Sequence, residues 1–154
     1  MSDVGTTTRA AGPSQASRLG RVRMASFGAV TMLIIEFVLG MIYNLYGTAP
    51  TATKSIGLFS SPVLALHVIV GILLFIAAVM LLVRAIGTRH RLTIGLSALG
   101  LVGIVAAGFA GLGFTSKGAA GASLGMALAF AVSLACYVVI ILVASPATAA
   151  HATT

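Results

Sequence analysis

The sequence predicts an all-α protein, an integral membrane bundle of four helices that run alternately up and down. The 154-residue chain is 59% hydrophobic and only 7% charged, far outside the range of soluble domains. It also contains four apolar stretches long enough to cross a hydrocarbon core of about 30 Å, which takes about 20 helical residues. We place these spans at residues 24–46, 62–86, 92–114 and 119–144.

The rest of the chain is short. Residues 1–22 and 146–154 are mostly small or polar without periodicity, so we expect two disordered cytoplasmic tails around one transmembrane domain at 23–145. No soluble catalytic domain fits in what remains. We therefore expect a non-enzymatic or accessory membrane protein.

The connections between the spans set the topology. The first, at residues 47–61, is the longest, and Pro62 behind it suits the first turn of the second helix, with Ser60 or Ser61 as the cap. The other two connections are so short that consecutive helices must be antiparallel neighbours.

Positive charge is distributed unevenly along the chain, whose formal net charge is +7. Arginines precede the first span and flank the second connection (Arg9, Arg18, Arg21, Arg23, Arg84, Arg89 and Arg91), whereas the other connections hold only Lys54 and Lys117. The positive-inside rule then places both termini in the cytoplasm and makes the chain a multi-pass protein of the plasma membrane. The arginines are topology signals first and attract anionic lipid second. We expect the lipid bilayer, and no nucleic acid, as a partner.

Small and polar residues recur at helical spacing in every span. The first span carries Gly28, Met32, Glu36, Gly40 and Asn44 at every fourth position, and the second carries His67 and Gly71. An acid, an amide and glycines do not favourably meet lipid, so we expect this face to point into the bundle.

Small-residue stripes in the third and fourth spans predict close helix packing. They comprise Gly103, Ala107 and Gly111, and Gly121, Gly125, Ala129 and Ser133. Their exposed remainder would permit a homo-oligomer or a larger membrane complex.

Glu36 is one of only two acidic residues and stands alone in an apolar run. An acid at mid-membrane depth costs about 2.5–3.5 kcal/mol on insertion scales, so it is by default a functional-site hypothesis. With Asn44 it forms the predicted proton or polar site. Two interpretations stay open: a structural hydrogen bond between helices, or a protonatable site in a relay.

His67 has two interpretations as well, a hydrogen-bonded core residue or an axial ligand of haem b. Met41 or Met126 would then supply the second ligand. From the helical rise, His67 lies roughly 7–8 Å below the outer boundary and Glu36 about 15 Å below it. We therefore expect a direct contact between them to need helix tilt or a bridging water.

The segment EFVLG at 36–40, a short outer loop and HVIVGILL at 67–74 together resemble a helix pair of the haem A synthase family. The resemblance covers residues 36–80 and implies a four-helix, haem-binding half with His67 as a haem ligand. The family has two such halves and a second histidine in each. This chain has one bundle and no second histidine at that depth, so the synthase activity is not implied.

Four short helices with a single acid in the first also resemble the small multidrug-resistance transporters. That resemblance implies a proton-coupled small transporter, acting as a dimer, with Glu36 as the coupling acid. The strong arginine bias fixes a single orientation, unlike many members of that family. Trp is absent and aromatic residues make up 6% of the chain, which is a poor lining for a cationic drug.

Overall fold

The computed structural model describes residues 15–145 apart from residues 49, 52 and 119. Four helices make up the fold: α1 (Gln15–Tyr46), α2 (Pro62–Thr88), α3 (Arg91–Lys117) and α4 (Ala120–Val143). All four are long and apolar enough to cross a membrane. The predicted all-α, four-helix membrane bundle is confirmed. The predictions for residues 1–14 and 146–154 lie outside the described residues.

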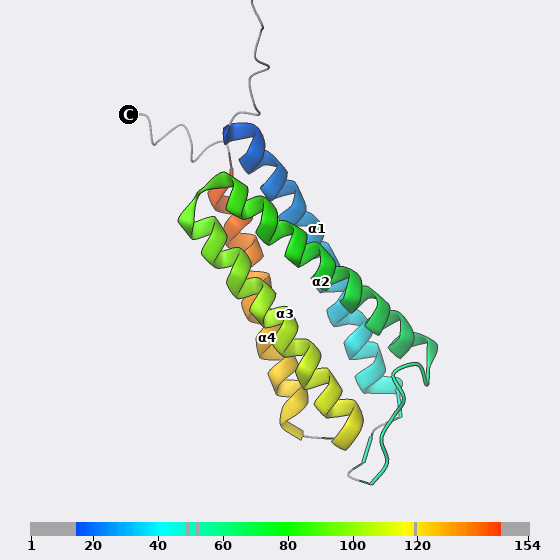
Figure 1. Ribbon diagram of the computed structural model, residues 1–154. Helices are drawn as coiled ribbons and strands as arrows, with labels where there is room; N and C mark the ends of the chain where they lie inside the picture. Colours follow the sequence, from blue (N-terminus) through cyan, green and yellow to red (C-terminus); the bar gives the residue numbers. More distant parts are fainter. Residues whose placement is uncertain (1–14, 49, 52, 119, 146–154) are drawn as a thin grey trace, which may run out of the picture.

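The helices run up and down around a ring, in which α1 packs against α2 and α4, and α3 packs against the same two helices (Figure 1). The two-residue turn between α2 and α3 lies at one end of the bundle, near the start of α1, and we call this the arginine end. The connections α1–α2 and α3–α4 lie at the other end, the loop end (Figure 1).

The start of α1 corrects the sequence prediction, because the helix begins at Gln15 and not at residue 24. Residues 15–22, which were assigned to a disordered tail, are helical. Two contacts hold them: Val22 is fully buried in the core, and Arg18 Nη1 donates to Gly87 O on α2 at 3.0 Å. Hydropathy marks the apolar span but does not detect an amphipathic extension that packs beside it.

The predicted start of α2, including its N-terminal cap, is confirmed. Ser61 has extended backbone angles and its hydroxyl accepts from Leu64 N at 3.2 Å, with Pro62 in the first turn. At the other end, α2 and α3 are joined by Arg89 and His90 alone. Arg89 takes a left-handed conformation (φ 57°), and its N–H donates to Ile86 O at 3.1 Å.

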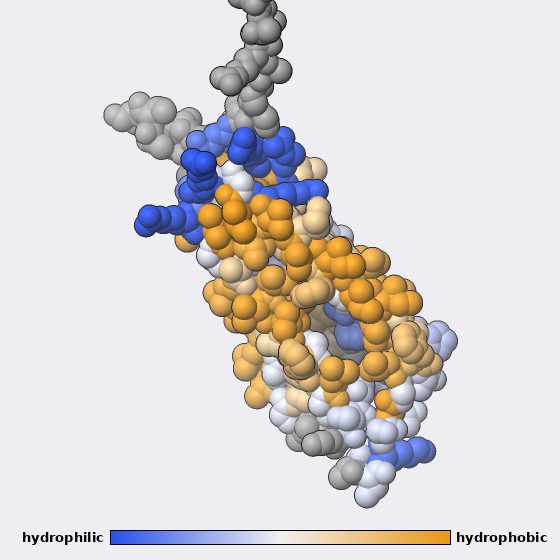
Figure 2. Space-filling model, in the orientation of Figure 1, coloured by the Kyte–Doolittle hydropathy of each residue, from blue (hydrophilic) through white to orange (hydrophobic). Residues whose placement is uncertain are grey.

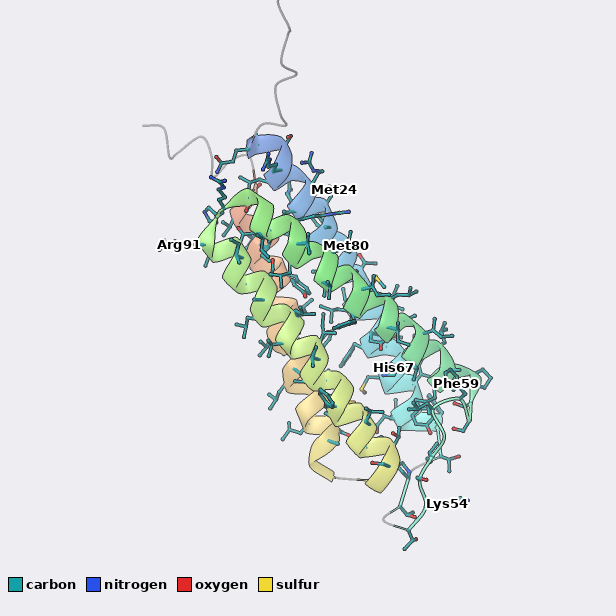
Figure 3. All side chains as sticks on the ribbon, viewed as in Figure 1. Met24, Lys54, Phe59, His67, Met80 and Arg91 are labelled. Atoms are coloured by element: carbon teal, nitrogen blue, oxygen red, sulfur yellow. The ribbon has the colours of Figure 1, made fainter. Side chains whose placement is uncertain are left out.

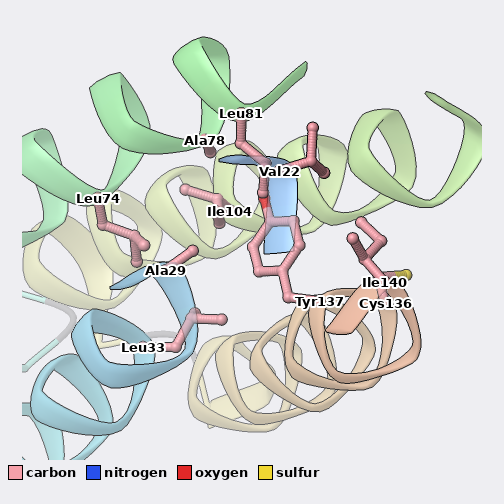
Figure 4. Close-up of a cluster of buried hydrophobic side chains, with 10 residues drawn as sticks. All are labelled: Val22, Ala29, Leu33, Leu74, Ala78, Leu81, Ile104, Cys136, Tyr137 and Ile140. Atoms are coloured by element: carbon pink, nitrogen blue, oxygen red, sulfur yellow. The ribbon is translucent and has the colours of Figure 1, made fainter. Parts of the chain in front are cut away.

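The hydrophobic core extends from the middle of the bundle toward the arginine end. Its members come from all four helices and surround the ring of Tyr137: Val22, Ala29, Leu33, Leu74, Ala78, Leu81, Ile104, Cys136, Tyr137 and Ile140 (Figure 4). Between this cluster and the loop end, Tyr43, Leu64 and Thr115 are the buried side chains among the described residues. The packing is therefore uneven along the bundle axis.

Helices α3 and α4 approach each other through the predicted small-residue stripes. A Cβ atom added to Gly103 would collide with Ser133 Oγ, and one added to Gly125 would lie 3.7 Å from Ala110 Cβ. The Ser133 hydroxyl lies 3.0 Å from Gly100 O on α3 and 2.9 Å from Ala129 O on its own helix, so its proton can satisfy either carbonyl. The expectation that these glycines serve packing holds for this pair of helices.

The long connection crosses the loop end from the α1–α2 hairpin to α3. Ile56 N donates to Thr115 O at 2.9 Å. Gly118, the cap of α3, has a left-handed backbone (φ 60°), and a Cβ there would lie 2.8 Å from Pro50 O. The connection thus ties the two hairpins together where their side chains pack least.

Gly118→Ala should lower the free energy of unfolding by at least about 1 kcal/mol, because alanine disfavours the left-handed conformation and its methyl would collide with Pro50 O. Chemical unfolding of the detergent-solubilised chain measures the loss. Gly95→Ala is the matched control, since no atom lies within 4 Å of a Cβ added there. Equal stability of the two variants would contradict the described packing of the connection.

Candidate functional site

Glu36 on α1 and His67 on α2 meet through a reciprocal arrangement with two glycines. Glu36 lies opposite Gly71, where an added Cβ would be 2.7 Å from Glu36 Oε1. His67 lies opposite Gly40, where an added Cβ would be 3.3 Å from His67 Cε1. Each glycine follows the polar residue of its own helix by four positions, one helical turn. The absent side chains leave the space that the acid and the imidazole fill.

His67 makes its hydrogen bonds through Nδ1. This nitrogen lies 3.2 Å from the backbone oxygen of Glu36 and 3.3 Å from Glu36 Oε1. A backbone carbonyl can only accept a hydrogen bond, so Nδ1 carries the proton that it shares between these two oxygens. In the neutral ring, Nε2 then holds a lone pair. No partner for Nε2 is found among the described residues.

Only one of the two carboxyl oxygens of Glu36 has a polar partner among the described residues. Oε1 faces His67, whereas Oε2 is buried and has no hydrogen-bond partner in the described part of the chain. Glu36 is also the only carboxylic acid among the described residues. The pair therefore presents two unused polar atoms, His67 Nε2 and Glu36 Oε2.

The pair is reachable from one side of the bundle. Figure 2 shows a hollow in the apolar face between α2 and α3, with hydrophilic surface inside it, in the region where Figure 3 labels His67. The side chains of His67 and Glu36 are 27% and 17% exposed, so a ligand or water can contact them. Between α1 and α4, Phe37 stacks on Phe130 with ring centroids 4.7 Å apart. That stack joins α1 to α4, whereas the hollow lies between α2 and α3.

The direct contact between Glu36 and His67 corrects the expectation that it would need tilt or a bridging water. That expectation compared the levels of the two residues along their helices. Helix carbonyls point toward the C-terminus, so the Glu36 carbonyl lies near the level of Gly40. Because Gly40 has no side chain, the imidazole reaches that carbonyl directly.

Asn44 does not join the pair, although it was predicted to share the inward face with Glu36. Both Asn44 and Gly28 are exposed. A repeat of four residues turns about 40° away from one face at each step, because the helix has 3.6 residues per turn. Two steps from Glu36 therefore turn about 80°, which carries both residues off the face that meets α2.

The two candidate methionines occupy different surroundings. Met41 is 40% exposed. Met126 packs toward α3, with its Sδ 3.6 Å from the position of a Cβ on Gly111. Gly40 and Gly71, which were predicted to share faces with Glu36 and His67, form the cradle of the pair. Their spacing four residues after an acid and a histidine was the available signal.

The fold and the site define a small four-helix membrane protein with a partly buried acid–histidine pair. Among the described residues, no group of three His, Cys, Asp or Glu side chains could hold a metal ion. No protein-family model, curated protein or solved structure matches this chain.

Gly71→Ala should lower the free energy of unfolding by about 1–3 kcal/mol, the usual cost of overpacking, because its methyl displaces the Glu36 carboxyl. Gly40→Ala should reduce the Nδ1–H form of His67, because its methyl pushes the ring away from the Glu36 carbonyl. Chemical unfolding and ¹⁵N NMR of labelled histidine measure the two effects. Gly28→Ala, where no atom lies within 4 Å of the new methyl, is the control and should change neither. A wild-type protein with the proton on Nε2 would contradict the geometry.

Proposed function

We propose that this chain is a non-enzymatic, accessory membrane protein in which Glu36 and His67 form a binding site for one polar group. The observation that supports this proposal is the pair of unused atoms, His67 Nε2 and Glu36 Oε2. Nε2 offers a lone pair and Oε2 offers a carboxyl oxygen. A ligand, a water or a proton in the adjoining hollow could use both.

Binding is favoured over packing because polar side chains that only hold helices together normally have hydrogen-bond partners for their buried polar atoms. A buried polar atom without a partner costs about 1–3 kcal/mol. Ser133 shows the structural alternative in this same bundle, since its buried hydroxyl has two carbonyl acceptors. The hydroxyls of Ser97 and Tyr137 are also buried without a partner among the described residues. The Glu36–His67 pair differs from them because its two side chains keep 17% and 27% exposure beside the hollow, where a ligand or water can reach the unused atoms.

Replacing the pair by apolar residues of similar size tests this proposal. The double variant Glu36→Met/His67→Leu should keep or raise the free energy of unfolding, because it removes the cost of burying an unpaired Oε2. Ser133→Ala should lower the same quantity by about 0.5–1.5 kcal/mol, because it removes a satisfied hydrogen bond. Unfolding of all three proteins in one detergent measures the difference. A loss of stability in the double variant larger than that of Ser133→Ala would assign the pair a structural role.

Haem b is a second candidate ligand, and the protonation of His67 favours it. Histidines that bind metals usually donate the other ring N–H to a carbonyl or carboxylate, and His67 Nδ1 has both acceptors. His67 Nε2 would hold the haem iron, and Met126 or Met41 would supply a second ligand. Bound haem would supply one-electron redox chemistry. The resemblance to the haem A synthase family points to the same histidine and remains a proposal.

An absorption spectrum tests the haem proposal. The full chain, expressed in haem-replete cells and purified in detergent, should show a Soret band that His67→Ala abolishes. His90→Ala is the matched control, because His90 caps α3 at the arginine end and should leave the band unchanged. Absence of the band from the wild-type protein, or its persistence in His67→Ala, would rule haem out at this site.

The transporter alternative uses the same Glu36 carboxyl, whose unpaired Oε2 would carry the coupled proton. We also propose that both termini lie in the cytoplasm, that the membrane is the plasma membrane, and that the chain assembles with further copies or subunits. These proposals rest on the arginine asymmetry and on the small-residue stripes.

A further inference from the structure

The arginine end gathers cationic side chains that the acid–histidine pair does not use. Arg18 and Arg21 come from α1, Arg84 from α2 and Arg89 from the turn after it. The only carboxylic acid among the described residues, Glu36, lies about 22 Å along α1 from Arg21 at 1.5 Å per residue. Within the described residues, no acid can therefore neutralise this cluster.

Two adjoining cavities lie among these side chains. The larger, of about 420 Å³, is lined by Gln15, Arg18, Gly87, Thr88, Arg89 and His90. The smaller, of about 180 Å³, is lined by Arg18, Arg21, Arg84 and Gly87. Arg18 and Gly87 belong to both linings, so the two cavities form one basic recess between α1 and the end of α2.

Local hydrogen bonds orient donors around this recess. Arg18 Nη1 donates to Gly87 O, which holds the guanidinium beside the end of α2, and no other partner of its five N–H donors lies among the described residues. His90 Nδ1 accepts from Thr93 N at 3.4 Å, so the proton of the neutral ring lies on Nε2. The recess therefore offers several donors and a multiple positive charge, which match a phosphate group.

Apolar surface lies directly beside the recess. Met24 on α1 and Met80 on α2 are 71% and 49% exposed, and Val83 and Ile86 on α2 are 58% and 55% exposed. Figure 2 shows the hydrophilic cap at this end giving way to apolar surface, and Figure 3 places Met24 and Met80 just below the cap. A ligand with a phosphate head and acyl chains would contact both surfaces at once.

We propose that this recess is a specific binding site for the phosphate headgroup of an anionic phospholipid, with its acyl chains lying along α1 and α2. The head would sit between Arg18, Arg21 and Arg84. Basic pockets at the ends of transmembrane helices bind anionic headgroups in this way. The apolar surface beside the cavities favours a lipid over a free phosphate ion.

The test titrates the full chain in neutral detergent with phosphatidylglycerol and counts bound lipid by native mass spectrometry. Arg18→Gln and Arg84→Gln should each weaken binding by about fivefold or more. Arg91→Gln is the matched control, since it removes one charge at the same end but lines neither cavity, and it should change binding by less than about twofold. Phosphatidylcholine should bind more weakly than phosphatidylglycerol to the wild-type protein.

Equal weakening by all three substitutions would show diffuse attraction and overturn the site. Displacement of phosphatidylglycerol by millimolar inorganic phosphate would show that the recess takes a free anion and would overturn the lipid assignment. Arg18 also ties α1 to α2, so helicity by circular dichroism is checked for each variant. If Arg18→Gln does not fold, Arg84→Gln carries the test, because Arg84 has no hydrogen-bond partner among the described residues.

Discussion

The hydrophobic core extends only from the middle of the bundle toward the arginine end, and the rest of the structure depends on this constraint. Tyr137 lies at the centre of the core and reaches across to α3, where an added Cβ on Gly100 would lie 2.6 Å from its ring. All four helices meet around this ring. Beyond it few side chains are buried, and α2 and α3 lie further apart toward the loop end (Figure 1). A polar pair can be kept there without being sealed in by apolar neighbours.

This core separates the two polar regions of the protein, the acid–histidine pair and the basic recess. The acid–histidine pair lies on its loop-end side, where Glu36 and His67 are partly exposed, and the basic recess lies at the arginine end. The apolar cluster between them contains no charged side chain. Among residues 15–145 as described, the acid therefore has no neutralising arginine and the arginines have no carboxylate partner.

The sequence was sufficient for the spans, the up-down order and the cap of α2, because these follow from local hydropathy and from residue types such as Ser61 and Pro62. It also selected Glu36 and His67. It failed where tertiary contacts decide. The start of α1 depends on Val22 and Arg18 meeting partners far along the chain. Asn44 was misplaced because a four-residue repeat drifts around a helix, and the role of Gly40 depends on the register between α1 and α2, which composition does not encode.

The connection across the loop end has a consequence for the route to the pair. Because Ile56 is bonded to Thr115 and Pro50 lies against Gly118, this segment spans the two hairpins at that end. The hollow beside His67 opens sideways, through the apolar face between α2 and α3 (Figure 2). A solute that enters by this side must dissolve in the hydrocarbon before it meets the imidazole. Lipid solubility would then act as a first filter, ahead of any recognition by the polar atoms, and would concentrate apolar solutes at the entrance.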